Sequence, residues 1–162
     1  MAIATATITI NAAFLQEIKE DSQGLHRLLH DALHLVSPQL VSLQHAHVSR
    51  RALVDLLGEL RDQLGLHFAL EEAYGYFEDA LSADPQLSRR ADALRGQHRE
   101  LFLEVCGLEE KAEQLLYHEA CASRLREISA GYHAFYERFV DHESRENDLI
   151  LQAFADDMAA DV

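Results

Sequence analysis

Two His-x-x-x-Glu pairs lie on apolar helical stripes of this chain. His67 precedes Glu71 and His142 precedes Glu146, so the members of each pair share one helix face, a turn apart. A third stripe carries His98 among leucine, alanine and valine residues. Burying an unpaired carboxylate or imidazole is costly, and several of them together require mutual pairing or a cation. A bound metal ion would compensate for burying the carboxylates and imidazoles of all three stripes.

The helices that position these residues can be predicted from where the chain breaks. Only two prolines occur, Pro38 and Pro85, and each lies in a short polar segment between long stretches rich in Leu, Ala, Glu and Arg. A weaker break lies near residues 117–121. This pattern predicts an all-α protein, with Ser49 as the N-cap of its second helix. The four expected helices cover residues 12–36, 49–81, 87–116 and 120–157.

Long helices joined by short connections are typical of an antiparallel, up-down four-helix bundle. A chain of 162 residues, of which 48% are hydrophobic, is long enough for one domain with a substantial core. We therefore expect a single bundle domain over residues 12–158. Residues 1–11 contain alternating Thr and Ile without an obvious strand to pair with. We expect an extended arm there, which is a candidate contact for a homodimer.

The candidate residues share one depth in the predicted bundle. At about 1.5 Å per residue, each lies about 10 to 16 residues from the end where the second helix leads into the third. On the first helix the same depth falls at His26. His30 and His34 follow at four-residue spacing, so His30 remains an alternative to His26. The predicted metal ligands are His26, His67, Glu71, His98, His142 and Glu146.

Other histidine, glutamate and aromatic residues near the candidate ligands are expected to lie outside the metal site. His133 and Glu137 repeat the His-x-x-x-Glu spacing, but they lie about 180° around the helix from the His142 pair and predict a surface pair. Glu72 points about 100° away from Glu71, so it is an outer ligand only if the helix is distorted. Phe102 follows His98 by one turn and predicts an apolar wall that limits access to one metal.

Six mixed nitrogen and oxygen ligands exceed what one tetrahedral zinc ion takes, and they include too many imidazoles for calcium or magnesium. Two iron or manganese ions use the set economically, with Glu71 and Glu146 as bridging carboxylates and the histidines capping each metal. The other common dimetal bundle, the ferritin-like kind, needs Glu-x-x-His on two helices. No histidine of this chain has a glutamate three residues before it.

Four pieces of the chain resemble the hemerythrin-like family, also called HHE cation-binding domains. They are one histidine on the first helix, H-F-A-L-E from residue 67, Q-H-R-E-L from residue 97 and D-H-E-S-R-E from residue 141. The resemblance covers nearly the whole chain. It implies a non-haem di-iron site inside a four-helix bundle, with the two iron ions bridged by an oxo or hydroxo group. Iron is therefore the expected metal, and manganese and zinc are the less favoured alternatives.

The resemblance also implies a range of activities. Family members bind oxygen, sense oxygen or iron, handle nitric oxide or peroxide, or deliver iron to damaged iron–sulfur centres. Oxygen-carrying members have a second histidine and an aspartate where this chain has Phe102 and Asn147, and Glu146 takes the alternative acidic position. The remaining four-histidine set resembles the His-x-x-x-Glu variants, which include iron-repair proteins, and leaves more than one coordination position for water, peroxide, nitric oxide or iron release.

The composition of the chain argues against some classes of binding partner and favours one cellular compartment. A formal net charge of −14 would repel a phosphate backbone, and no stretch reaches the roughly 18 apolar residues of a membrane span. The N-terminal run lacks the basic residues and apolar core of a signal peptide. Cys106 and Cys121 lack C-x-x-C spacing and fit a reducing compartment. We expect a cytoplasmic protein that binds neither nucleic acid nor membrane.

Together these observations predict a non-haem di-iron protein that binds a small diatomic ligand (oxygen or nitric oxide), peroxide or labile iron in redox or stress handling. Two alternatives remain open. One is a di-iron enzyme that consumes peroxide or repairs iron centres, and sustained gas evolution from peroxide would reveal the former activity. The other is a metal-free helical interaction module, whose stability would not depend on His98 or His142.

Overall fold

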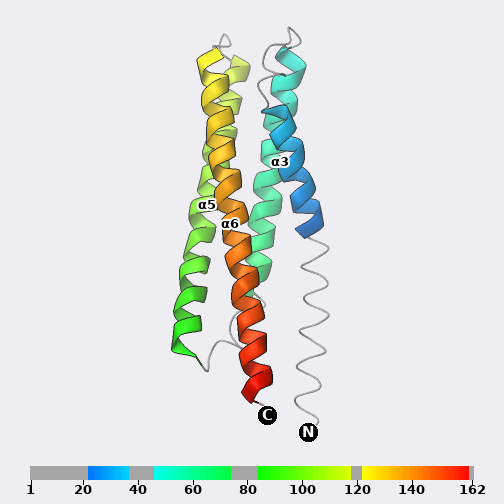
Figure 1. Ribbon diagram of the computed structural model, residues 1–162. Coiled ribbons are helices and arrows are strands. Elements are labelled where there is room, and N and C mark those ends of the chain that lie inside the picture. The colour runs from blue at the N-terminus through cyan, green and yellow to red at the C-terminus, as the bar shows by residue number, and fades with distance from the viewer. Residues whose placement is uncertain (1–21, 37–45, 74–83, 118–121, 161–162) are drawn as a thin grey trace.

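The computed structural model describes residues 22–36, 46–73, 84–117 and 122–160, which form four helices with no strand among them. The first covers residues 22–35, and the others are α3 (Ala46–Ala73), α5 (Pro85–Tyr117) and α6 (Ala122–Ala160). Figure 1 shows them side by side, each running opposite to the one before it in the chain. The all-α four-helix bundle is therefore confirmed.

Two helices lie close to the expected ranges: α5 spans Pro85–Tyr117 against the expected 87–116, and α6 spans Ala122–Ala160 against the expected 120–157. The prediction that Ser49 caps the second helix is wrong, because α3 begins at Ala46 and contains Ser49. No proline or glycine separates the two residues, so the helix extends back past the serine. The predicted arm over residues 1–11, the predicted helical residues 12–21 and 74–81, and Cys121 lie outside the described residues.

The start of α5 follows from an aspartate–proline step. The Asp84 side-chain oxygen Oδ1 accepts a hydrogen bond from the backbone N–H of Gln86 (2.8 Å), and the Asp84 carbonyl accepts one from the N–H of Ser88 (3.0 Å). Asp84 is thus the N-cap. Pro85 stands at the first helical position, where a missing N–H leaves no helix hydrogen bond unmade.

The buried face of α5 repeats every three or four residues, as an amphipathic helix requires. Its buried residues are Leu87, Ala91, Leu94, His98, Leu101, Val105, Leu108, Ala112 and Leu115. His98 is the one member of this stripe that can ionise. The stripe carries it to the middle of the bundle, with apolar residues on both sides along the helix.

A polar layer separates two apolar clusters in the core. The larger cluster draws on all four helices and includes Leu29, Leu60, Val105, Phe135 and Phe139. The smaller cluster comprises Leu87, Ala91, Leu94, Leu149 and Ala153. The buried polar residues between them are His67, Glu71, His98, His142 and Glu146.

One buried hydrogen bond ties the first helix to α6. The hydroxyl of Tyr132 donates to the backbone carbonyl of Leu29 at 2.7 Å, and both residues are fully buried. The bond fixes the first helix against α6 on the larger-cluster side of the polar layer. Within the described ranges, no helix combines the length and the apolar character that crossing a membrane requires.

Candidate metal centre

Four buried side chains from three helices converge in the polar layer. One ligand atom from each of Glu71, His98, His142 and Glu146 lies within 4.8 Å of the others. Nε2 of His98 is 3.2 Å from Oε2 of Glu71 and 3.4 Å from Oε1 of Glu146. The Nε2 atom of His142 is 3.1 Å from the same Glu146 oxygen. Two carboxylates therefore face two imidazoles across the bundle.

His67 joins this group through its partner on α3. Its Nε2 atom lies 2.8 Å from Oε1 of Glu71, and both side chains are buried. The His-x-x-x-Glu spacing thus brings a ring and a carboxylate into contact on one helix face, as it also does for His142 and Glu146 on α6. Each glutamate contacts a histidine of its own helix and also His98 on α5.

His26 lies at the edge of the site, on the first helix. Its side chain is 44% exposed, and its Nε2 atom is 3.0 Å from Oε2 of Glu143 on α6. Burial and the nearby His67 lower the pKa of His26, so the ring is electrostatically close to the centre. The alternative, His30, is exposed and lies edge-on against Tyr136, with ring centroids 6.3 Å apart. His26 thus contacts the residue that follows His142 and interacts electrostatically with His67 of the polar layer.

Two buried atoms of the cluster have no hydrogen-bond partner. Oε2 of Glu71 and Nε2 of His142 approach their neighbours to 3.2 Å and 3.1 Å, but neither contact has hydrogen-bond geometry. Two donors about 2.1 Å from one ion and at right angles to each other would lie about 3.0 Å apart. Since orphaned buried polar atoms are otherwise costly, these residues fit a bound cation.

Two residues of the cluster, Glu71 and His98, have strongly shifted pKa values. Burial alone would raise the pKa of Glu71, but its proximity to His67 and His98 outweighs burial and lowers that pKa to about 2. Burial alone would lower the pKa of His98, yet contacts with Glu146, Glu71 and Glu72 raise it to about 10. In the metal-free protein, a protonated His98 therefore supplies the positive charge that the carboxylates need.

Residues outside the cluster hold two of its rings. Nδ1 of His98 donates to Oε1 of Glu72 at 3.1 Å, and Nδ1 of His142 donates to Oε1 of Gln97 at 2.9 Å. With Nδ1 occupied as a donor, Nε2 is the nitrogen of each ring that faces the glutamates and can offer its lone pair to a metal, in His98 once the ring has lost its proton. Phe68 stacks on His98, with ring centroids 4.1 Å apart and planes 7° apart.

Reasoning from the sequence missed Gln97 and Glu143. Gln97 directly precedes His98 and Glu143 directly follows His142, so each neighbours a ligand candidate but lies off the apolar stripe. The side chain of Glu143 is only 17% exposed. Burial raises the pKa of this carboxyl to about 7 against the opposing effect of His67. The sequence feature that could have identified both residues is a polar side chain directly beside a candidate ligand.

Three residues outside the metal centre were predicted to lie on the surface or to wall the site, namely His133, Glu137 and Phe102. His133 and Glu137 are both exposed, as expected of a surface pair. Phe102 is half-buried, and its ring would meet a side-chain carbon placed at Gly65 of α3 at 3.2 Å. The glycine thus allows the Phe102 ring to pack directly against the backbone of α3.

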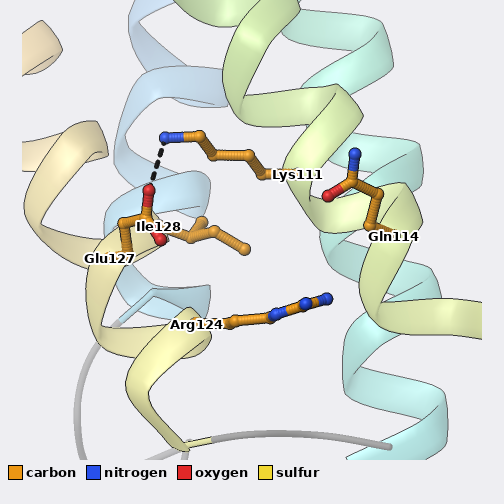
Figure 2. Close-up of a pocket in the computed structure, with 5 residues that line it drawn as sticks. All are labelled: Lys111, Gln114, Arg124, Glu127 and Ile128. Carbon is orange, nitrogen blue, oxygen red and sulfur yellow. Dashed lines mark hydrogen bonds and ion pairs between the residues drawn. The ribbon is translucent and has the colours of Figure 1, made fainter. Parts of the chain in front are cut away.

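A pocket lies elsewhere on the bundle, between α5 and α6. Figure 2 shows it lined by Lys111, Gln114, Arg124, Glu127 and Ile128, with Nζ of Lys111 2.8 Å from Oε1 of Glu127. Its lining contains two cations and one carboxylate but no histidine. The pocket is therefore separate from the metal centre and offers no ligand set for a transition metal.

Comparison with known proteins agrees with the geometry. The family model of the hemerythrin HHE cation-binding domain matches residues 15–154, which include every candidate ligand. Neither the comparison with curated proteins nor that with solved structures finds a significant match. The family match and the buried histidine–glutamate cluster point to bound metal ions. The chain belongs to the hemerythrin family of HHE cation-binding domains.

Proposed function

We propose that this protein is a non-haem di-iron protein that binds a small ligand in cytoplasmic redox or stress handling. The observation that carries the proposal is the buried group of Glu71, His98, His142 and Glu146, whose orphaned atoms fit a cation. His67 extends the group on α3 and His26 on the first helix. These six residues are the proposed ligands, with the two glutamates shared between the metal positions.

Iron would supply a change between ferrous and ferric states and open coordination positions for an added ligand. The protein's part is to hold the donors in place. Glu72 and Gln97 fix the rings of His98 and His142, and Phe68 covers one face of His98. Because the four central ligands are buried, oxygen, nitric oxide, peroxide or an iron ion fits this centre better than a larger substrate does.

The first test is the metal content and visible spectrum of full-length protein purified without added metal. We expect about two irons per chain with absorption bands of a bridged iron pair, and loss of both features in His98→Ala. His133→Ala, an exposed histidine on α6, is the matched control and should behave as wild type. Wild-type protein without iron, or with one zinc that does not depend on His98, would overturn the proposal.

The ligand is then assigned by adding oxygen, nitric oxide and peroxide separately to the iron-loaded protein. A stable spectral shift without turnover identifies binding of the added molecule. Sustained gas evolution from peroxide, lost in Glu146→Ala, would instead identify a peroxide-consuming enzyme. Iron passing to a chelator without either response would favour a role in holding labile iron.

A further inference from the structure

Glu143 occupies a position that the six proposed ligands do not explain. It lies on α6 directly after His142, its side chain is only 17% exposed, and its Oε2 atom is 3.0 Å from Nε2 of His26 on the first helix. A buried carboxylate is costly unless it is paired with a cation or well hydrogen-bonded. The imidazole of His26 is half-exposed, so it is a weak source of positive charge.

The nitrogen that Glu143 contacts distinguishes two roles. Where Glu72 and Gln97 hold a ring in place, they contact Nδ1 of His98 and His142. Where Glu71 and Glu146 meet a histidine as proposed metal ligands, they contact Nε2 instead. Glu143 contacts Nε2 of its histidine. It therefore follows the pattern of the ligand carboxylates, not that of the residues that orient rings.

Distance and charge agree with this pattern. Neighbouring donors on one ion lie about 3.0 Å apart, which is the distance observed between Glu143 and His26. Glu143 also interacts electrostatically with two like charges, Glu71 and Glu146. Three carboxylates gathered beside one layer of histidines repel one another, and a bound cation would relieve that repulsion.

We propose that Glu143 is a seventh metal ligand, which binds the same ion as His26 on the side of the centre that faces the first helix. The inference rests on the proposed di-iron function and refines it. The two metal positions then differ, because the one near the first helix gains an oxygen donor while the one near His98 and His142 is richer in nitrogen. Hard oxygen donors favour the ferric ion, so the position near Glu143 holds iron more firmly after oxidation.

The decisive variant is Glu143→Gln in the full chain. Glutamine has the same shape and keeps an oxygen that can accept a hydrogen bond from His26, but its neutral amide is a poor metal ligand. The metal-free variant should be at least as stable as metal-free wild type, since it removes a partly buried carboxylate from beside two others. Glu137→Gln, at an exposed position of the same helix, is the matched control.

Each protein is loaded with ferrous iron without oxygen, desalted and analysed for iron and for thermal unfolding. We expect about two irons per chain in wild type and Glu137→Gln, and about one in Glu143→Gln, His26→Ala and the double variant, because all three lose the same ion. Two irons retained by Glu143→Gln would overturn the seventh ligand, and so would iron loss accompanied by lower metal-free stability. Wild type without iron would overturn the di-iron proposal itself.

Discussion

The amide oxygen of Gln97 on α5 lies 2.9 Å from Nδ1 of His142 on α6, while Nε2 of the same ring faces Glu146. This bond selects the tautomer whose lone pair lies on the metal-facing nitrogen. Gln97→Leu should therefore weaken metal binding by about 10- to 100-fold, which a chelator competition would measure. Gln114→Leu, at an exposed position of α5, should retain wild-type affinity, and equal losses in both variants would contradict the assigned role.

The raised pKa of His98 gives the metal-free protein a defined pH dependence. An unfolded histidine has a pKa near 6.5, whereas folding raises this one to about 10. Its contribution to stability is therefore fully present below about pH 6.5 and is lost as the pH rises through about 10. Urea unfolding of metal-free protein across this window should show the decline. A His98→Gln variant should lack this component of the slope.

Metal binding should depend on pH in the opposite direction. His98 must release its proton before Nε2 can hold an ion, so protons compete with metal over the same window. The apparent affinity should rise by about tenfold per pH unit between about pH 7 and pH 9 for each proton released. Titration in weak buffer with a pH indicator would detect that proton. An affinity that is flat over this range would show that His98 is not the group displaced.

The hydrogen bond between the first helix and α6 should contribute measurably to stability. Tyr132→Phe removes the hydroxyl that donates to the Leu29 carbonyl in the fully buried core. We expect a loss of about 1 kcal/mol in the free energy of unfolding, measured by denaturant titration. Tyr136→Phe, at a half-buried position one turn later, is the control and should cost less.

Two helix glycines should respond differently to substitution. A side-chain carbon at Gly96 meets no atom within 4 Å, so Gly96→Ala should stabilise α5 by about 0.5–1 kcal/mol through helix propensity. At Gly65 the same carbon lies 3.2 Å from the Phe102 ring, which must move. Gly65→Ala should therefore gain less than Gly96→Ala in thermal unfolding. Equal gains would show that the Phe102 ring relaxes without cost.

Much of the fold follows from periodicity alone. All nine buried residues of α5 belong to the stripe expected from its three- and four-residue spacing, including His98. Leucine-rich segments without internal proline leave the helix as the one way to bury that stripe. The convergence of the two His-x-x-x-Glu pairs with His98 was predictable for the same reason, since a ligand on a core stripe must point inward.

The contacts beyond the stripe were not predictable in this way. Gln97 and Glu143 are partly buried because a neighbouring helix covers them, and which flank of a helix is covered depends on how the helices rotate and cross. Periodicity gives the direction of the core but not the width of the covered surface. The boundary of α3 shows a similar limit, because Ser49 suits both an N-cap and a helix interior.

The stacking of Phe68 on His98 also bears on how metal would enter and leave the centre. With an aromatic ring parallel to one face and Glu72 on Nδ1, the His98 ring cannot turn without displacing both neighbours. His26 is half-exposed and belongs to a different helix. We expect metal ions to enter and leave the centre past the first helix, while the His98 side of the centre on α5 keeps its conformation. Exchange rates would then follow the motion of the first helix and not that of the bundle as a whole.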